Sequence, residues 1–309
     1  MKKFYKLILF IIGILSLSSC NNPNERINVI IPSGTPSLGV TNFLASNQEL
    51  VNYKIVDGTD LLAVAFTNGD YDVILAPINL GAKMYQRNQQ YILNSVLVWG
   101  NLFIASKEPL EDFKSLENKE ITIFGKYATP DIVMTKLLTY YNLKKVKVNY
   151  VNDVTTAQGL FLTNKADIIL TAEPSLSMLK TKVSLYELNL QHEWYKITSD
   201  SSYPQVGVFI KKEKIEDKRI NHVISAFIKS IDDTIAYPSL VAEKAVTLHE
   251  SFERLGVDVL TNAISNCSYY YQNASDSRKA IELYFEQIIA MGLTEQIGGG
   301  LPNEEFYQK

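Results

Sequence analysis

The chain is poor in cysteine and histidine and has no block of basic residues. Its 309 residues include two cysteines and three histidines, and 33 acidic side chains outnumber 30 basic ones. Two cysteines cannot build a disulfide-rich scaffold. Without a clustered basic surface, nucleic-acid binding is not expected. No second long apolar run follows the amino-terminal segment, so the body of the chain does not read as membrane-spanning.

Catalytic signatures are absent as well. The sequence shows no phosphate loop, no metal-ligand spacing and no nucleophile with a nearby base. The histidines, His192, His222 and His249, follow no predicted strand of the sheets described below. His192 is interpreted as a surface or packing residue. The sequence therefore predicts a protein that is not an enzyme and that needs no cofactor or metal.

The amino terminus has the pattern of an export signal. Lysines occur within the first six residues, an apolar run covers residues 7–15, and Leu17-Ser18-Ser19-Cys20 follows. This end resembles the bacterial lipobox, which implies that residues 1–19 are a signal peptide and that Cys20 carries lipid. An uncleaved anchor does not predict the small residues before Cys20. We expect residues 20–26 to be a lipidated tether, and the protein to be extracytoplasmic and held on the bacterial cell membrane by lipid alone.

Processing at Cys20 changes the charge and the thiol count. Removing residues 1–19 removes three lysines and no acid, which leaves 27 basic and 33 acidic residues and a net charge of −6. With Cys20 acylated, Cys267 has no partner within the chain. The fold therefore cannot depend on a disulfide, and Cys267 is expected to be a buried or half-buried small residue.

Residues 27–44 predict a strand, a tight loop and a helix. The apolar run ends at Pro32, Ser33-Gly34 forms the turn, and Thr35-Pro36 opens an amphipathic pattern. Thr35 is the predicted N-cap and Pro36 the first helical residue, so that amides at the helix start are free for an anion or a polar ligand group. An ordinary capped helix is the alternative interpretation.

The same order of elements recurs about 95 residues later. Alternating strands and helices over residues 27–85 predict a parallel sheet flanked by helices, and residues 121–170 repeat them. Thr129-Pro130 corresponds to Thr35-Pro36, with Thr129 as the second predicted N-cap. The sequence thus predicts an α/β fold of two similar lobes, each a mostly parallel sheet flanked by helices. Chance similarity between α/β segments remains the alternative.

Two extended segments, residues 91–106 and 202–211, are predicted to cross between the lobes, with Gly100 as a bend. Lobe 1 then comprises residues 27–100 and 205–309, and lobe 2 comprises residues 101–204. The later helical segments are expected to pack on lobe 1.

Taken together, these segments resemble the substrate-binding lipoproteins of ABC importers, in the nitrate/sulfonate/taurine and thiamine-precursor group with the type II periplasmic-binding-protein-like fold. The resemblance covers residues 27–307, and its order and spacing are more specific than any single motif. One departure is Asn118, where the family usually has glycine. The segments that carry the resemblance are residues 17–20, 32–37, 68–72, 76–77, 115–121, 129–130, 173–174 and 203–205.

The resemblance implies a hinged clamp that captures a small organic solute between two lobes and delivers it to an ABC permease and its ATPase. A monomer is expected. Ligands bind beyond the carboxyl ends of the strands, so loops at these ends would line the cleft, with Thr35 and Thr129 facing each other. The predicted ligand-binding residues are Ser33, Gly34, Thr35, Asp57, Thr59, Asn79, Trp99, Asn101, Tyr127, Thr129, Asn152, Glu173 and Tyr203, with Asp153 beside them.

The residue types in this set bear on the solute. Lys126 is the one cation among these loops, whereas Trp99, Tyr127 and Tyr203 are aromatic. The mixture favours a nitrogen-containing or aromatic solute over a bare oxyanion. Two other functions stay open: an enzyme of the thiamine-pyrimidine synthase branch of the fold, and a surface lipoprotein that binds a protein through residues 269–271. For each predicted residue, a cap or turn role without ligand contact is the alternative.

Overall fold

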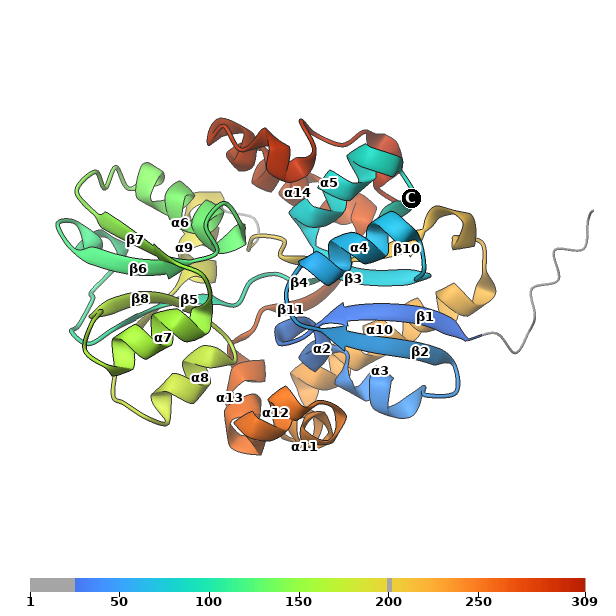
Figure 1. The fold of residues 1–309 in the computed structure, drawn as a ribbon, viewed down its shortest axis with the longest axis horizontal. Coiled ribbons are helices and arrows are strands. Elements are labelled where there is room, and N and C mark those ends of the chain that lie inside the picture. The colour runs from blue at the N-terminus through green and yellow to red at the C-terminus, as the bar shows by residue number, and fades with distance from the viewer. Residues whose placement is uncertain (1–25, 199–201, 309) are drawn as a thin grey trace, which may run out of the picture.

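The computed structural model describes residues 26–198 and 202–308. Over these residues the chain forms two lobes that lie side by side along the longest axis of the molecule (Figure 1). Each lobe contains one β-sheet with helices on its faces, and two chain segments connect the lobes. The predicted two-lobed α/β fold is confirmed.

The first sheet has six strands in the order β11-β4-β10-β3-β1-β2. Strand β1 pairs in parallel with β2 and β3, whereas β10 runs antiparallel to β3 and β4, and β11 antiparallel to β4. The strands are β1 (Ile27–Pro32), β2 (Val51–Val56), β3 (Val73–Pro77), β4 (Tyr91–Val98), β10 (Val206–Lys211) and β11 (Tyr269–Asn273).

The second sheet has five strands in the order β7-β6-β8-β5-β9. Strand β6 is parallel to β7 and β8, and β5 is antiparallel to β8 and β9. These strands are β5 (Leu102–Ser106), β6 (Glu120–Phe124), β7 (Lys147–Val151), β8 (Ile168–Ala172) and β9 (Tyr186–Asn189). Both sheets are therefore mixed rather than mostly parallel, because the strands next to the crossings run against the β-α-β units.

Helices cover both sheets. In lobe 1 they are α2 (Thr35–Gly39), α3 (Thr41–Ser46), α4 (Asp60–Asn68), α5 (Ile78–Asn88), α10 (Lys218–Ala236), α11 (Pro238–Leu248), α12 (Glu250–Leu255), α13 (Val257–Asn266) and α14 (Ala274–Ala290). In lobe 2 they are α6 (Thr129–Tyr140), α7 (Val154–Leu162), α8 (Ser175–Lys180) and α9 (Leu190–Thr198). Short 3-10 turns lie at η1 (Phe113–Leu116), η2 (Lys212–Lys214), η3 (Thr294–Ile297) and η4 (Glu304–Phe306). None of the helices in the described ranges is long and apolar enough to traverse a membrane.

The crossings hold the lobes together by apolar packing as well as by chain connectivity. Strands β4 and β5 are consecutive in the chain but belong to different sheets, and β9 and β10 repeat this switch. One buried apolar cluster includes residues of both lobes. Within it, the Trp194 ring of α9 packs edge-on against Tyr203 of the second crossing (5.6 Å between centroids) and against Tyr284 of α14 (6.2 Å). This aromatic cluster fills the junction between the lobes.

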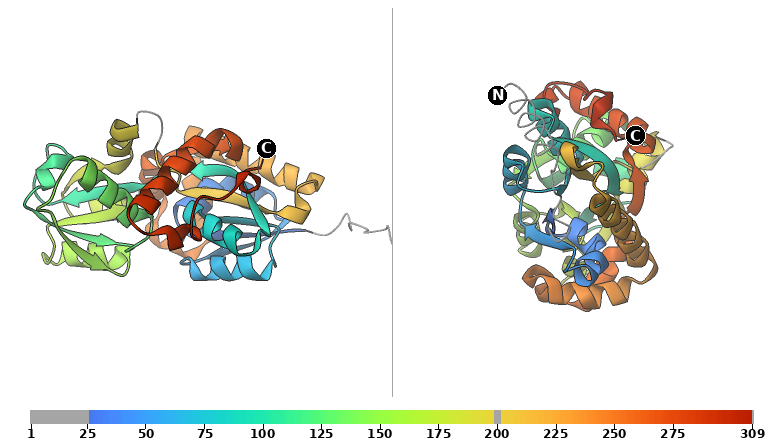
Figure 2. Two further views of the ribbon diagram at one scale, coloured as in Figure 1. Left: turned by 90° about the horizontal axis from the view of Figure 1, so that it is seen from above. Right: turned by 90° about the vertical axis from the view of Figure 1, so that its right-hand side faces the viewer.

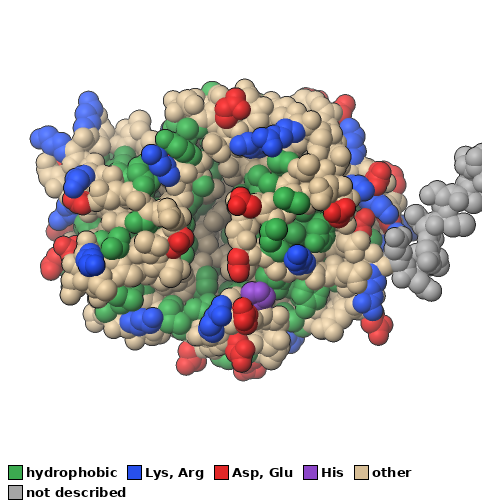
Figure 3. Space-filling model, viewed as in Figure 1, with side chains coloured by type: hydrophobic (Ala, Val, Ile, Leu, Met, Phe, Trp, Pro, Cys, Tyr) green, Lys and Arg blue, Asp and Glu red, His purple; other side chains and the backbone are tan. Residues whose placement is uncertain are grey.

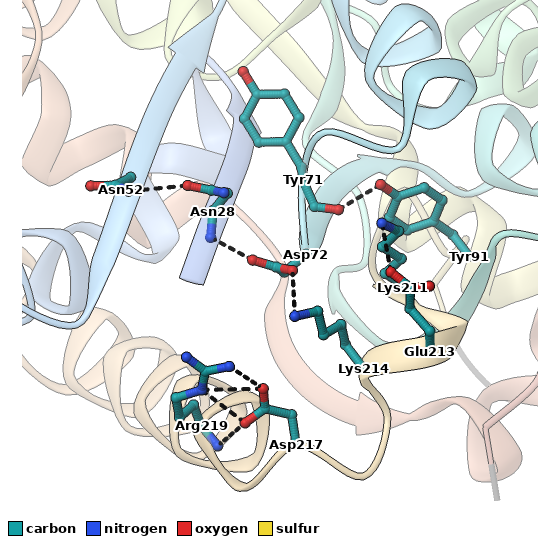
Figure 4. A network of polar contacts seen from close by, with 10 residues as sticks. All are labelled: Asn28, Asn52, Tyr71, Asp72, Tyr91, Lys211, Glu213, Lys214, Asp217 and Arg219. Carbon is teal, nitrogen blue, oxygen red and sulfur yellow. Dashed lines mark hydrogen bonds and ion pairs between the residues drawn. The ribbon is translucent and has the colours of Figure 1, made fainter. Parts of the chain in front are cut away.

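A polar network lies at the amino-terminal ends of strands β1, β2 and β3 in the first sheet (Figure 4). The Asp72 carboxylate accepts a hydrogen bond from the backbone amide of Asn28 (2.9 Å) and lies 3.9 Å from the Lys214 ammonium. The Asn52 side chain donates to the Asn28 side chain (3.1 Å). Because Asp72 precedes β3, these bonds hold β1, β2 and β3 in register at their amino ends. Their carboxyl ends point toward lobe 2 (Figure 1).

Candidate functional site

A cleft separates the two lobes. Figure 3 shows the surface hollowed between them, and Figure 1 shows α14 above this region and α13 below it in the same view. Helix α14 contacts α6, and α13 contacts α8, so the lobes touch at both ends of the cleft. Seen from above, the lobes lie side by side along the long axis (Figure 2, left). Seen along that axis, one lobe lies behind the other (Figure 2, right).

Thr35 and Asn101 connect the lobes at a single backbone carbonyl. The Thr35 hydroxyl donates to the carbonyl oxygen of Glu173 (3.1 Å), and the Asn101 side-chain amide donates to the Thr35 hydroxyl (2.7 Å) and to the same carbonyl (3.2 Å). All three side chains are buried. The sequence-predicted residues Thr35, Asn101 and Glu173, which are up to 138 positions apart, are thus brought together.

The Glu173 carboxylate is only 3% exposed and its oxygens are already hydrogen-bonded. One oxygen accepts the Ser177 amide (3.1 Å), and the other accepts the Ser177 hydroxyl (3.0 Å) and the Asn266 side-chain amide (2.7 Å). Burial raises the pKa of this carboxyl above its ordinary value, although the three donors act in the opposite direction. Asn266 ends α13 and was not among the predicted residues.

The two crossings are joined through Asn101 as well. The Gln205 amide of the second crossing donates to the Asn101 side-chain oxygen (2.9 Å). Tyr203, fully buried, donates its hydroxyl to the Gln191 side-chain oxygen (2.7 Å), and Gln191 also accepts the Leu102 amide (2.9 Å). Burial raises the pKa of Tyr203. Trp99 is 4% exposed and donates to the Tyr270 carbonyl (2.9 Å). These side chains form the junction of the lobes.

The threonine hydroxyls do not cap their helices, contrary to the sequence prediction. Gly34 and Ala128 occupy the N-cap positions, and neither helix start has a side-chain cap bond. Thr129 instead accepts a hydrogen bond from the Tyr284 hydroxyl (3.0 Å) of α14. Each threonine therefore bonds to the opposite lobe, Thr35 through Glu173 and Thr129 through Tyr284. Both prefer these partners because a buried hydroxyl needs one and the first-turn amides do not supply it.

The remaining predicted residues lie nearer the surface. Asp57, Thr59, Asn152 and Asp153 are exposed, and Ser33, Gly34 and Asn79 are partly buried. The Ser33 hydroxyl donates to the Asp57 carboxylate, which joins the first two loops of lobe 1. Asp153 caps α7 by accepting the Thr156 amide (2.7 Å), as its alternative interpretation expected.

Tyr127 is an exposed aromatic on a constrained loop. Its φ is +64°, a conformation that bulky residues rarely adopt, and its ring is 47% exposed. The buried Asp131 carboxylate accepts the Tyr127 amide (2.8 Å) and the Tyr150 hydroxyl (2.8 Å). Burial and this carboxylate raise the pKa of Tyr150 to about 12. The Lys126 ammonium lies 5.0 Å from the ring centres of both tyrosines.

Other polar contacts around Thr35 were not foreseen. The Tyr269 hydroxyl donates to the Thr35 carbonyl (2.8 Å), and the Cys267 sulfur lies 3.8 Å from the Thr35 hydroxyl. Burial, with Glu173 nearby, raises the pKa of the Cys267 thiol. Residues 269–271, considered as a protein-binding patch, form strand β11 at the edge of the first sheet, with Tyr269 buried and Tyr270 exposed.

Two other surface grooves are not lined by the predicted ligand-binding residues. One of about 620 Å³ lies beside α9 and includes His192, Glu193 and Asn266. Another of about 470 Å³ lies on lobe 1 between α3, α10 and α11. Within the described ranges, no group of three or more His, Cys, Asp or Glu residues is arranged to hold a metal ion.

Solved structures share this architecture. An ABC transporter structure from Parabacteroides distasonis matches with a TM-score of 0.79 at 23% identity, over 92% of this chain and 99% of that one. The periplasmic aliphatic sulphonate-binding protein SsuA from Escherichia coli matches with a TM-score of 0.71 at 12% identity, over 92% of each chain. The alkanesulfonate-binding protein SsuA from Xanthomonas axonopodis, bound to MOPS, matches with a TM-score of 0.62 at 12% identity, over 90% and 94%.

The chain has the fold of ABC-importer binding proteins. No protein-family model matches it, and neither does any curated protein. The resemblance predicted from the sequence is thus confirmed at the level of the binding-protein fold. Nearly the whole chain takes part in the match, including both lobes and both crossings.

The crossing glycine gives a test of the junction. Gly100 has a φ of +114°, and a Cβ there would lie 2.7 Å from Gln191 and 2.8 Å from Tyr203. We expect Gly100→Ala to destabilise the protein by roughly 2–4 kcal/mol, because backbone strain and overpacking add. The measurement is chemical unfolding. The control is Gly159→Ala in α7, where nothing lies within 4 Å and a gain of about 0.5–1 kcal/mol is expected. Equal stability of the two variants would contradict the prediction.

Proposed function

We propose that this chain is an extracytoplasmic solute-binding lipoprotein that captures a small organic solute between its lobes and delivers it to an ABC importer. The observation that carries the proposal is the pair of contacts across the cleft, Thr35 to Glu173 and Thr129 to Tyr284. Thr35, Thr129 and Glu173 follow the carboxyl ends of strands β1, β6 and β8. Each contacts the opposite lobe at the end of its sheet where open α/β sheets bind ligands, which supports the proposal.

The two crossings support a clamp mechanism. Two extended segments allow one lobe to rotate against the other, and a ligand that contacts both walls shifts the population toward the closed form. The permease and ATPase would then recognise the closed form. We propose the division into lobe 1, residues 27–100 and 205–309, and lobe 2, residues 101–204, because the strands of each sheet fall within these ranges.

The exposed and partly buried residues after the strand ends are the proposed solute contacts: Ser33, Gly34, Asp57, Thr59, Asn79, Tyr127 and Asn152. Trp99 and Tyr203 are too deeply buried to stack on a solute without rearrangement, which leaves Tyr127 as the aromatic contact. Lys126 beside it is held over two tyrosine rings. A solute with a ring or an amine fits this wall better than a bare oxyanion.

The competing functions receive less support. His192 lies on the exposed side of α9, and His249 caps α12, so neither is placed for catalysis at a strand end. The exposed Tyr270 is a single aromatic, which is unremarkable on a protein surface. A binding protein without catalytic activity therefore remains our proposal.

Binding measurements test the function. In a thermal-shift screen of metabolites with the purified full-length protein, we expect stabilisation by at least one ring-bearing or amine-bearing solute, because a ligand of the folded state raises the melting temperature. Calorimetry then gives the affinity. Tight binding of nitrate or alkanesulfonate, with none for pyrimidines or amines, would overturn the solute class. Absence of any hit would contradict solute capture.

Tyr127 gives a residue-level prediction. We expect Tyr127→Ala to weaken binding of the identified ring-bearing solute roughly three- to tenfold, since an aromatic contact contributes about 0.5–1.5 kcal/mol. Tyr140→Ala is the matched control, because Tyr140 is 54% exposed at the far end of α6. Calorimetric titration of both variants is the measurement, and equal affinities would remove Tyr127 from the site.

Membrane attachment is tested at the two cysteines. Cys20 lies outside the described residues. We expect cells that express the protein to incorporate a labelled fatty acid into it, and Cys20→Ala to abolish the label. The control is Cys267→Ala, which removes the other thiol and should leave labelling unchanged. Labelling of Cys20→Ala at the level of the unchanged protein would exclude lipidation at this site.

A further inference from the structure

The buried Glu173 carboxylate receives donors from both lobes. Ser177 supplies two of them, its amide and its hydroxyl, and Ser177 belongs to α8 of the same lobe as Glu173. The third donor is the Asn266 amide at 2.7 Å, which comes from α13. Among the hydrogen-bond donors to this carboxylate in the described part of the chain, Asn266 is thus the contribution of lobe 1.

Helix α13 is firmly attached to lobe 1. Its residues Leu260 and Ile264 are buried in the apolar cluster of that lobe, and the helix packs against α11 and α2. Asn266 is its last residue and is half-buried, so the side-chain amide is held at a fixed place. When the lobes separate, Glu173 moves with α8 and Asn266 stays with α13. An opening that moves α8 away from α13 would therefore break or lengthen their hydrogen bond.

Closing the cleft removes water from a carboxylate that has only neutral hydrogen-bond donors. Burial of such a group is costly unless its hydrogen bonds are replaced. The Ser177 donors are present whether the lobes are open or closed, because Ser177 lies in the first turn of α8, four residues after Glu173 in the same lobe. The Asn266 donor is gained only on closure. The hydrogen bond from Asn266 therefore offsets part of the free-energy cost of removing water from the Glu173 carboxylate when the lobes close.

We propose that the Asn266–Glu173 hydrogen bond sets the balance between open and closed lobes, and that both are positioning residues for the cleft rather than solute contacts. The inference rests on the proposed function in assuming that the lobes move. The bond makes the closed form accessible before a solute arrives. It thereby lowers the share of solute binding energy that closure consumes.

The experiment uses the full-length protein without solute, so that it does not depend on any ligand. Spin labels at Asp60→Cys and Thr155→Cys, exposed positions in the first turns of α4 in lobe 1 and α7 in lobe 2, report the separation of the lobes by pulsed electron paramagnetic resonance. Asn266→Ala removes the hydrogen bond between Asn266 of lobe 1 and the Glu173 carboxylate of lobe 2. Ser177→Ala removes one bond to the same Glu173 oxygen but within lobe 2, and is the matched control. The emission of Trp194, which packs on Tyr284 of α14, is a second readout.

With Asn266→Ala we expect a longer label distance, an open-to-closed ratio raised about tenfold and a red-shifted Trp194 emission, as for the loss of a hydrogen bond to a buried carboxylate. Ser177→Ala should leave all three unchanged. An unchanged distance in Asn266→Ala, or equal opening in both variants, would overturn the proposal. If Asn266→Ala fails to open the lobes but the protein binds a solute, the proposed function stands and this inference is wrong. If Asn266→Ala opens the lobes but no solute binds, this inference stands and the proposed function is wrong.

Discussion

The hydroxyl of Thr35 is the contact on which the arrangement of the lobes depends. It donates from the first turn of lobe 1 to the backbone carbonyl of Glu173 in lobe 2, and it accepts a hydrogen bond from the side-chain amide of Asn101 in the crossing between them. A buried hydroxyl and a buried carbonyl both lose stability when they are left unpaired. The strand exits of β1 and β8 are therefore held together with the hinge, and every loop at the carboxyl ends of the strands is placed relative to this contact.

The surroundings of that contact explain why polar residues occupy the junction. Glu173 and Asn101 are both buried, and each uses its side chain to bond across a boundary, Glu173 to α13 and Asn101 to the second crossing. Apolar packing of Trp194 against Tyr203 and Tyr284 favours contact between the lobes. Because the hydrophobic effect is not directional, this packing does little to fix how the lobes are oriented. The hydrogen bonds define one relative orientation of the lobes, since they tolerate only small changes in distance and angle.

The order of the strands and helices could be predicted from the sequence, but the hydrogen-bond partners of individual side chains could not. Alternating strands and helices, the repeat near 95 residues and the two extended crossings follow from local pattern, and the structure has all of them. The antiparallel placement of β5 and β10 depends on how a crossing enters its sheet, which local pattern does not encode. Thr35 was assigned to a cap because its neighbours suit one. Its hydrogen-bond partner, Glu173, is 138 residues away in the chain. A single sequence does not show that so distant a partner replaces the local helix amide.

Among the site residues, the burial of Trp99 and Tyr203 and the part played by Asn266 were beyond the sequence for the same reason. Asn266 ends a helix, where asparagine is common, and only the packing of α13 beside α8 gives it a carboxylate to bind. Glu173 is predicted from the sequence as a ligand contact because a carboxylate at a strand exit has no local explanation, whereas in the structure its oxygens accept hydrogen bonds from Ser177 and Asn266. The exposed loop residues are predicted from local pattern alone, since polar residues after a buried strand lie at the end of the sheet where ligands bind in open α/β folds.

The two matching loops also differ in a way that bears on function. Both contain a residue with positive φ, Gly34 at +87° in lobe 1 and Tyr127 at +64° in lobe 2. Glycine adopts this conformation freely, whereas tyrosine loses roughly 1–2 kcal/mol. The bond from the Tyr127 amide to the buried Asp131 offsets part of that loss. A glycine would remove the strain, but it would also remove an exposed ring from the edge of the cleft. A tyrosine at this position fits the proposed aromatic contact to the solute on the wall of lobe 2, while the wall of lobe 1 offers backbone and small polar groups.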